Sequence, residues 1–250
     1  MYLPLKRKLP NITSKIPPII AMAIILLGWE LVSISGIVPS YMLPSPVAVV
    51  KALLGDLPTI LFHAKFTLLE SFYGLLIGIA LAFVFATLMD RFRVMDQAFY
   101  PIMIITQTIP TIAIAPILVL WMGFGMAPKI TLVVITTFFP ITIGLLDGYK
   151  SVDPDAIRLM KAKGASRGQI FRHVKFPGAL PQFFSGLKIS ASYAVVGAVV
   201  SEWLGGFNGL GVYMTRVKKA YAFDKMFAVI IFIVIISLLL LLAVNIISRI

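Results

Sequence analysis

The sequence contains no cysteine and only two histidines. Disulfide bonds, thiolate metal ligands and a cysteine nucleophile are therefore excluded. The charge distribution predicts a topology that places His63 and His173 on opposite sides of a membrane, so they cannot share a metal or an acid–base site. We expect a chain without a metal site and without a cofactor.

Motifs for metal-dependent proteolysis and for nucleotide binding are also missing. The sequence has no His-Glu-x-x-His motif, and it lacks the Gly-x-x-x-x-Gly-Lys-Ser/Thr loop that cradles nucleotide phosphates. We therefore predict a non-catalytic chain, and any ATP-driven motor would be a separate polypeptide.

Charged residues are scarce. Only 13% of the 250 residues are charged and 60% are hydrophobic, and the mean hydropathy is +1.00. One soluble core cannot enclose so much apolar surface, so the chain is predicted to be an integral membrane protein. The apolar runs are continuous rather than alternating, which favours an all-α membrane protein over a barrel of strands.

Six apolar runs are long enough to cross a hydrocarbon core, which takes roughly 20 helical residues. We predict one transmembrane domain over residues 16–250, after a cytoplasmic tail of residues 1–15, with a loop at 148–185 between the fourth and fifth spans. The six runs cover residues 16–38, 66–89, 99–122, 127–146, 186–204 and 226–248.

Acidic residues are few, at 10 against 22 lysines and arginines, which gives a net charge of +12. With the N-terminus inside, most of the basic residues fall in inner segments, above all in the 148–185 loop. Basic loops resist translocation, so we predict that both termini and this loop are cytoplasmic. The positive charge is explained by topology and contact with membrane lipid, without nucleic acid.

The polar segment DPDAIRLMKAKGASRGQIFRHVKFPGALP at 153–181 interrupts the apolar sequence. Asp153 can cap a first helix that has Pro154 in its first turn, and Gly164 is placed to stop it. Such a helix, followed by a turn and a second helix, predicts a contact with a partner at the membrane surface.

The second helix of this segment has its own signals. Ser166 and Gln169 form a capping-box pattern, and an apolar stripe of Ile170, Phe171 and Val174 follows. Proline interrupts helical hydrogen bonding, so Pro177 is expected to end this helix.

The segment resembles the cytoplasmic loop of ABC importer permeases, in which Glu-Ala-Ala, a glycine four residues later and a distant Ile-x-Leu-Pro mark the helix that docks on the ATPase. Gly164 aligns with the family glycine, and the stretch 174–177, Val-Lys-Phe-Pro, falls at the later spacing. Arg158 replaces the acidic residue, although Asp155 lies on an adjacent turn. The resemblance implies ATPase contacts at Asp155, Ile157, Arg158, Met160, Gly164, Ala165, Phe171 and Pro177.

The motif Leu-Pro-Ser-Pro at 43–46 and the amphipathic run 47–54 after it resemble the corresponding segment of the nitrate, sulfonate and taurine branch of these permeases. The stretch 201–224 resembles the permeases that import pyrimidine precursors of thiamine. The family implies a bacterial or archaeal cytoplasmic membrane, a homodimer of permeases, two ATPase subunits and an extracytoplasmic binding protein.

The third apolar run carries prolines and polar residues in its middle. Pro110 lies among Gln107, Thr108 and Thr111. A broken helix at membrane depth is tolerated where it is packed in protein or lines a watery path, so this segment is a candidate wall of the translocation path. The alternative is a kinked helix whose threonine hydroxyls bond to their own backbone.

Glu30 and Glu202 are ionisable residues inside spans and are functional hypotheses by default. Glu202 is followed by Trp203, and the pair is a candidate ligand contact or gate, with an interfacial anchor as the alternative for Trp203. Glu70 and Asp147 lie near span ends, where their side chains can reach water, and are interpreted as structural.

These features predict the permease subunit of an ATP-driven importer of a small solute. The membrane-embedded polar residues suit a neutral or weakly basic ring, such as a hydroxymethylpyrimidine-type thiamine precursor, better than an oxyanion. A sulfonate, taurine or nitrate permease is the alternative. A stand-alone secondary transporter is disfavoured because we find no paired intramembrane charges and no inverted repeat. A non-transporting scaffold leaves the proline-broken third span unexplained.

Overall fold

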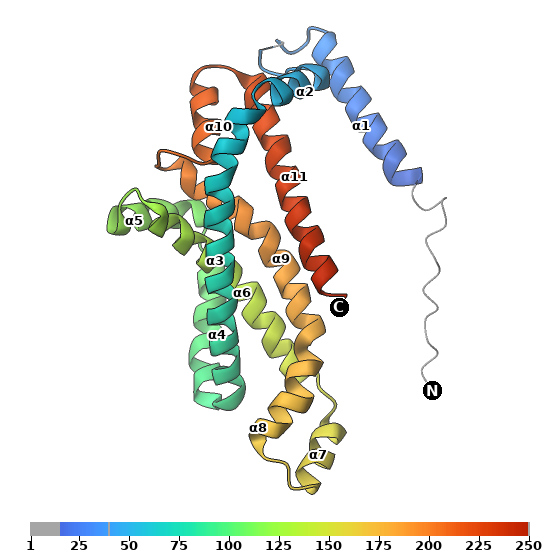
Figure 1. Cartoon of the computed structure of the whole chain (residues 1–250), viewed down its shortest axis with the longest axis vertical. Helices are drawn as coiled ribbons and strands as arrows, with labels where there is room; N and C mark the ends of the chain where they lie inside the picture. Colours follow the sequence, from blue (N-terminus) through green and yellow to red (C-terminus); the bar gives the residue numbers. More distant parts are fainter. Residues whose placement is uncertain (1–15, 40, 250) are drawn as a thin grey trace.

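A computed structural model describes residues 16–39 and 41–249, and these residues form helices and no strands (Figure 1). The predicted tail at residues 1–15 lies outside the described residues. The elements are α1 (Ile16–Ile34), α2 (Pro46–Gly55), α3 (Leu57–Arg91), α4 (Arg93–Thr108), α5 (Thr111–Met122), α6 (Met126–Lys150), α7 (Pro154–Ala162), α8 (Arg167–Ile170), the π-helical turn η2 (Phe171–Lys175), α9 (Phe176–Trp203), α10 (Leu210–Lys219) and α11 (Phe223–Ile247).

Five helical segments are long and apolar enough to cross a membrane, and the α4–α5 pair makes a sixth if it is one broken span. The all-α membrane fold is thereby confirmed, with five candidate spans and a sixth where the α4–α5 pair is counted as one. Two spans are longer than the sequence predicts: α3 has 35 residues, and α8, η2 and α9 form one continuous helix of 37 residues.

The predicted single third span is two helices, α4 and α5, bent by 101° relative to each other. The bend falls at Ile109 and Pro110, whose ψ angles of 121° and 126° are extended rather than helical. A residue before proline avoids the helical region, and proline has no N–H to donate to the preceding turn. The chain therefore turns sharply inside the bundle instead of crossing it in a straight line.

Helices α3, α6 and α9 form the centre of the bundle and pack closely through small residues. A Cβ on Gly78 of α3 would lie 2.4 Å from the Thr137 hydroxyl of α6, and one on Gly186 of α9 would lie 2.4 Å from the Pro140 carbonyl of α6. Only glycine permits these approaches. Small residues at such positions are common where membrane helices pack closely.

Helix α1 stands beside this bundle, and none of its residues is buried (Figure 1). It is attached near its C-terminal end, where the Trp29 indole donates to the Pro44 carbonyl (3.0 Å) and the Ser33 hydroxyl donates to the Leu43 carbonyl (2.9 Å). The amphipathic run at 47–54 lies in α2, and Ser45 caps this helix by accepting from the Ala48 N–H.

Helices α2 and α10 lie toward one end of the molecule, and α7 and α8 lie at the other (Figure 1). The α3–α4 junction is joined to the α7–α8 end, because Lys175 donates to both carboxylate oxygens of Asp90 at 2.7 and 2.8 Å. The two basic regions around Arg91 and 150–175 therefore share one end, in keeping with the charge distribution that predicts a common cytoplasmic side.

Candidate functional site

The break between α4 and α5 opens a cavity in the bundle, bounded also by α6 and α9. Its volume is about 220 Å³. The wall carries hydroxyl, amide and phenol groups among apolar side chains, and it carries no charged side chain. The polar members are Thr106, Gln107, Thr111, Thr136 and Tyr193.

The residues around Pro110 in the sequence have different surroundings in the structure, and only some of them line the cavity. Gln107 and Thr111 line the cavity, and Pro110 lies in the break itself as the residue before α5. The Thr108 hydroxyl instead donates to the Ile105 carbonyl of its own helix at 2.7 Å, as the alternative of a self-bonded threonine describes.

Two wall residues carried no functional prediction of their own. Thr136 lies on α6 and Tyr193 on α9, and both reach the cavity because those helices pack against the α4–α5 break. Single polar residues in long apolar runs are common, so nothing in the sequence distinguished these two. Only the packing of the helices brings them beside Gln107.

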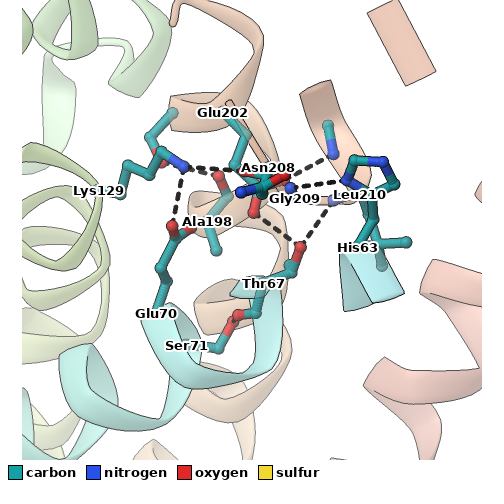
Figure 2. A network of polar contacts seen from close by, with 12 residues as sticks. His63, Thr67, Glu70, Ser71, Lys129, Ala198, Glu202, Asn208, Gly209 and Leu210 are labelled. Carbon is teal, nitrogen blue, oxygen red and sulfur yellow. Dashed lines mark hydrogen bonds and ion pairs between the residues drawn. The ribbon is translucent and has the colours of Figure 1, made fainter. Parts of the chain in front are cut away.

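A second polar cluster, called the α10 cluster below, is buried between α3, α6, α9 and the start of α10 (Figure 2). Lys129 of α6 and Glu70 of α3 form an ion pair at 2.8 Å, and their side chains are 6% and 1% exposed. The Lys129 ammonium also donates to the Asn208 carbonyl (3.2 Å). Glu202 of α9 accepts from the Thr67 hydroxyl at 2.7 Å. The cluster therefore joins three spans to the 204–209 loop.

The N-terminus of α10 is held by the same cluster, which Figure 2 shows from close by. The first N–H groups of a helix have no partner within it, and here three consecutive ones donate to side chains of α3 and α9. The His63 imidazole accepts the Gly209 N–H at Nδ1, so the proton of the neutral ring is on Nε2. The bonds run from Gly209 to His63 (3.1 Å), from Leu210 to Thr67 (2.8 Å) and from Gly211 to Glu202 (2.6 Å).

This arrangement changes the interpretation of two glutamates. Glu202 is 1% exposed and binds the start of α10, so it does not lie on the wall of the α4–α5 cavity. Glu70 does not reach water near a span end, because α3 begins at Leu57 and the side chain is deep in the bundle. The statement that the chain has no paired intramembrane charges is wrong, since Lys129 in the first turn of α6 pairs with Glu70.

The remaining residues predicted for the path lie elsewhere. Glu30 is half-buried on α1, outside the α4–α5 cavity and the α10 cluster. Trp203 ends α9 and is 39% exposed, next to the loop that follows. Neither residue lines the cavity.

The caps predicted for α7 are present in the structure. The Asp153 carboxylate accepts from the Asp155 N–H (2.8 Å), and Pro154 is the first helical residue. The helix ends in a Schellman motif, in which the Ala165 N–H donates to the Met160 carbonyl (3.0 Å) and Gly164 has a φ of +78°. The left-handed conformation at this position is the reason for the glycine.

The side chains of α7 divide into an outward face and an inward face. Asp155 and Arg158 form an ion pair at 2.9 Å with side chains 80% and 79% exposed, whereas Ile157 and Met160 are half-buried. Beyond the turn, the half-buried Phe171 ring lies tilted against the Tyr149 ring of α6, with centroids 5.3 Å apart. Asp155 thus pairs with Arg158, which occupies the position of the acidic residue in the family motif.

Pro177 does not end the second helix of the segment, and that prediction is wrong. The capping box of Ser166 and Gln169 starts α8 as predicted, but the helix continues through η2 into α9. In η2 the Phe176 N–H donates five residues back to Phe171, a π-type bond. Pro177 then lies in the first turn of α9, where its missing N–H costs little.

Residues 164–168, Gly-Ala-Ser-Arg-Gly, match the letters of the nucleophile elbow of hydrolases. The structural context does not fit, because the serine follows α7 rather than a strand. Its hydroxyl accepts from the Gln169 N–H as a helix cap. Within residues 16–39 and 41–249 no group of three potential metal-ligating side chains is close enough to hold a metal ion.

Comparison with known proteins assigns the chain to a family. Residues 74–250 match the family described as binding-protein-dependent transport system inner membrane component. A probable ABC transporter permease protein of Haemophilus influenzae is 38% identical over 88% of this chain and 90% of the relative. The formylaminopyrimidine transport permease protein ThiX of Halalkalibacterium halodurans is 37% identical over 84% of each chain.

Solved structures agree on the fold. The crystal structure of an amino acid ABC transporter with histidines superposes with a TM-score of 0.66 at 14% identity, covering 78% of this chain and 95% of the other. The fold and the site define a multi-pass permease of the inner membrane. The chain belongs to the binding-protein-dependent transport system inner membrane component family and is the permease of an ABC importer.

Proposed function

We propose that this permease carries a hydroxymethylpyrimidine-type thiamine precursor through the cavity at the α4–α5 break. The observation that carries the proposal is the wall chemistry: Gln107 offers an amide, Tyr193 offers an aromatic ring, and the wall has no charged residue. The amide and hydroxyl groups can form hydrogen bonds with the ring nitrogens and the hydroxymethyl group of the solute, and the phenol ring can stack on the pyrimidine.

The name of the ThiX relative supports the same class of solute. The second candidate is a sulfonate, taurine or nitrate. An oxyanion is best held by cationic side chains, and the described cavity wall has no lysine or arginine; the only feature there that favours an anion is the N-terminal end of α5 at Thr111.

Uptake in a strain that carries only this importer distinguishes the two candidates. Labelled hydroxymethylpyrimidine is expected to enter, labelled taurine is not, and Tyr193→Ala is expected to lower pyrimidine uptake by about tenfold through loss of ring stacking. Tyr73→Ala is the matched control, because Tyr73 is exposed on α3 and does not line the cavity. Uptake of taurine alone would refute the pyrimidine proposal.

The α7–α8 segment is proposed to dock on a separate ATPase subunit. Its outward face, with Asp155 and Arg158 exposed, is free to meet a partner, and open space surrounds Gly164. ATP-driven closure of the motor would move α7 and, through the continuous α8–α9 helix, the wall residue Tyr193 on the same helix.

The assembly is proposed to be a homodimer that receives its solute from an extracytoplasmic binding protein, with both termini cytoplasmic. One copy offers a cavity of only about 220 Å³ that remains open at the bundle surface, and a second copy would complete a sealed path. Purification in detergent checks this: an ATPase subunit and two permease copies are expected to elute together. Ion flux through vesicles containing the chain alone would favour a stand-alone transporter.

A further inference from the structure

The connection between α10 and α11 contains a tyrosine in a strained backbone conformation. Tyr221 has a φ of +56°, and among the described residues no other residue except glycine has a positive φ. It follows α10 in a Schellman motif, in which the Ala222 N–H donates to the Val217 carbonyl at 3.0 Å. The same motif ends α7, where Gly164 takes the left-handed position. The chain therefore places a bulky residue where its own second example of the motif has glycine.

The strain at Tyr221 is not offset by burial of its side chain. Tyr221 is 75% exposed, and its ring meets the ring of Phe223 only at an edge, with centroids 6.2 Å apart. The left-handed conformation costs free energy in any residue with a Cβ, and glycine would remove that cost. Strained conformations of this kind are found where the side chain serves a function. The exposed ring therefore points to a role outside the fold.

Basic side chains precede this tyrosine on the exposed side of α10. Lys218 and Lys219 end the helix, and neither has an acidic partner among the described residues. Arg216 is also exposed, and its guanidinium donates to the Phe207 carbonyl at 2.6 Å instead of to a carboxylate. Phe207 itself is 78% exposed. An exposed aromatic residue thus lies at each end of α10 and cations lie between them. We call this set the α10 surface: Phe207, Arg216, Lys218, Lys219 and Tyr221.

Helix α10 is a rigid support for this surface. The α10 cluster holds its N-terminus, and its inward face packs against α3, α9 and α11 through Leu210, Tyr213 and Val217. The Tyr213 hydroxyl also donates to the Asp56 carboxylate at the start of α3. An interface that is held in place before binding loses less conformational entropy on association. The α10 surface is therefore suited to docking a partner.

The α10–α11 connection lies at the end of the molecule opposite α7 and α8, which is the outer end in the proposed orientation (Figure 1). Lysines in outer loops run against the positive-inside bias, so topology does not account for Lys218 and Lys219. The family description names a binding protein on which transport depends. The inference below rests on the proposed orientation and on delivery by an extracytoplasmic binding protein, and it is independent of the solute.

We propose that the α10 surface docks an acidic patch of the extracytoplasmic binding protein. Carboxylates of the partner would pair with the lysines and Arg216, and the Tyr221 ring would fill an apolar recess beside them. Aromatic and arginine side chains on a rigid support are enriched at the centres of protein interfaces, which favours a protein over lipid headgroups as the occupant. The first N–H groups of α10 bond to Thr67 and Glu202, so docking acts on a helix that is joined directly to two spans.

The measurement is the concentration of the importer's purified binding protein that half-maximally stimulates ATP hydrolysis by the complete transporter in nanodiscs. The double variant Lys218→Gln, Lys219→Gln is expected to raise this concentration about fivefold or more, and to make it less sensitive to salt. The control variant Lys51→Gln, Lys65→Gln removes two exposed lysines of α2 and α3 and is expected to behave like the parent. Both variants have the same net charge, so general electrostatic attraction changes equally.

Tyr221→Asn separates docking from stability. Asparagine tolerates the left-handed conformation, so the variant is expected to unfold at the temperature of the parent or above it. Loss of the ring is expected to raise the half-stimulating concentration of the binding protein about tenfold. A clearly lower unfolding temperature would show that the ring stabilises the fold or anchors it in the membrane, and would overturn its assignment to a partner.

Two further outcomes would overturn the proposal. Equal half-stimulating concentrations for the parent and the α10-surface variants would remove this surface from the docking site while leaving the importer assignment intact. A difference that occurs in nanodiscs of phosphatidylglycerol and disappears in those of phosphatidylcholine would assign the surface to lipid headgroups. A binding protein that does not stimulate even the parent would refute the proposed delivery of solute, and this inference with it.

Discussion

The carboxylate of Glu202 is enclosed in protein, and both of its oxygens accept hydrogen bonds, one from the Thr67 hydroxyl and one from the Gly211 N–H. A buried carboxylate without such partners would be costly, because the interior solvates charge poorly. Thr67 is central to the arrangement, since its hydroxyl donates to Glu202 and accepts from the Leu210 N–H. At the residue scale, therefore, these groups fix where α10 begins.

Thr67→Val is expected to lower the free energy of unfolding by about 1 to 3 kcal/mol, because it leaves the Leu210 N–H and one Glu202 oxygen without a partner in a dry site. Thr142→Val is the control, since the buried Thr142 hydroxyl bonds only to a carbonyl of its own helix. Thermal unfolding of both variants in detergent makes the comparison. Equal losses of unfolding free energy in the two variants would show that the α10 cluster does not stabilise the fold.

Gly209→Ala is expected to be more damaging than an ordinary glycine replacement. Gly209 has a φ of +129°, and an added Cβ would fall 2.2 Å from the Glu202 carboxylate carbon, so backbone strain and a clash act together. The expected loss is about 2 to 4 kcal/mol, shown by a lower unfolding temperature. Gly125→Ala, whose Cβ meets nothing within 4 Å, should be neutral.

At the scale of elements, the α7–α8 segment combines a rigid connection with an exposed end. Its second helix runs without a break into α9, and α9 carries both Tyr193 of the cavity wall and Glu202 of the α10 cluster. A displacement at α8 can therefore reach the cavity along one continuous helix, and α7 is joined to that helix by the turn at 163–166. The helix end at Gly164 is the part left free for a partner.

Gly164→Trp is expected to insert normally but to lose about tenfold or more of its substrate-stimulated ATP hydrolysis with the motor subunit, because the indole fills the surface on which the ATPase docks. Gly164→Asn is the control: asparagine tolerates the left-handed conformation, φ +78°, and adds little volume. Full activity of the tryptophan variant in vesicles would remove the docking assignment.

At the scale of the whole molecule, the two ends differ in charge and in structure. The α7–α8 end carries the basic segment and a basic cavity of about 580 Å³, and the opposite end carries α2 and α10 (Figure 1). The asymmetry fits a transporter that meets a motor at one face and a solute carrier at the other. It also makes the orientation of the chain testable.

Because the sequence has no cysteine, single cysteines report the topology without background. Lys163→Cys is expected to react with a membrane-impermeant maleimide only after the cytoplasmic side is opened, since basic loops stay inside. Phe207→Cys, at a position 78% exposed in the loop before α10, should react from outside in intact cells. Labelling of Lys163→Cys in intact cells would contradict the proposed contact with the motor.

The sequence by itself determined the membrane class, the six apolar runs, the caps of α7 and α8 and the interruption at Pro110, whereas the structure decided that this interruption is a 101° break rather than a kink. The former features depend on composition and on neighbours within one helical turn. Tertiary structure decided the rest. Pro177 lies within a continuous helix, directly after a π-helical turn in which the Phe176 N–H donates to the Phe171 carbonyl. Thr136, Tyr193 and the Glu70–Lys129 pair acquire their places only when α3, α6 and α9 pack together, since contacts between distant spans leave no local pattern in the chain.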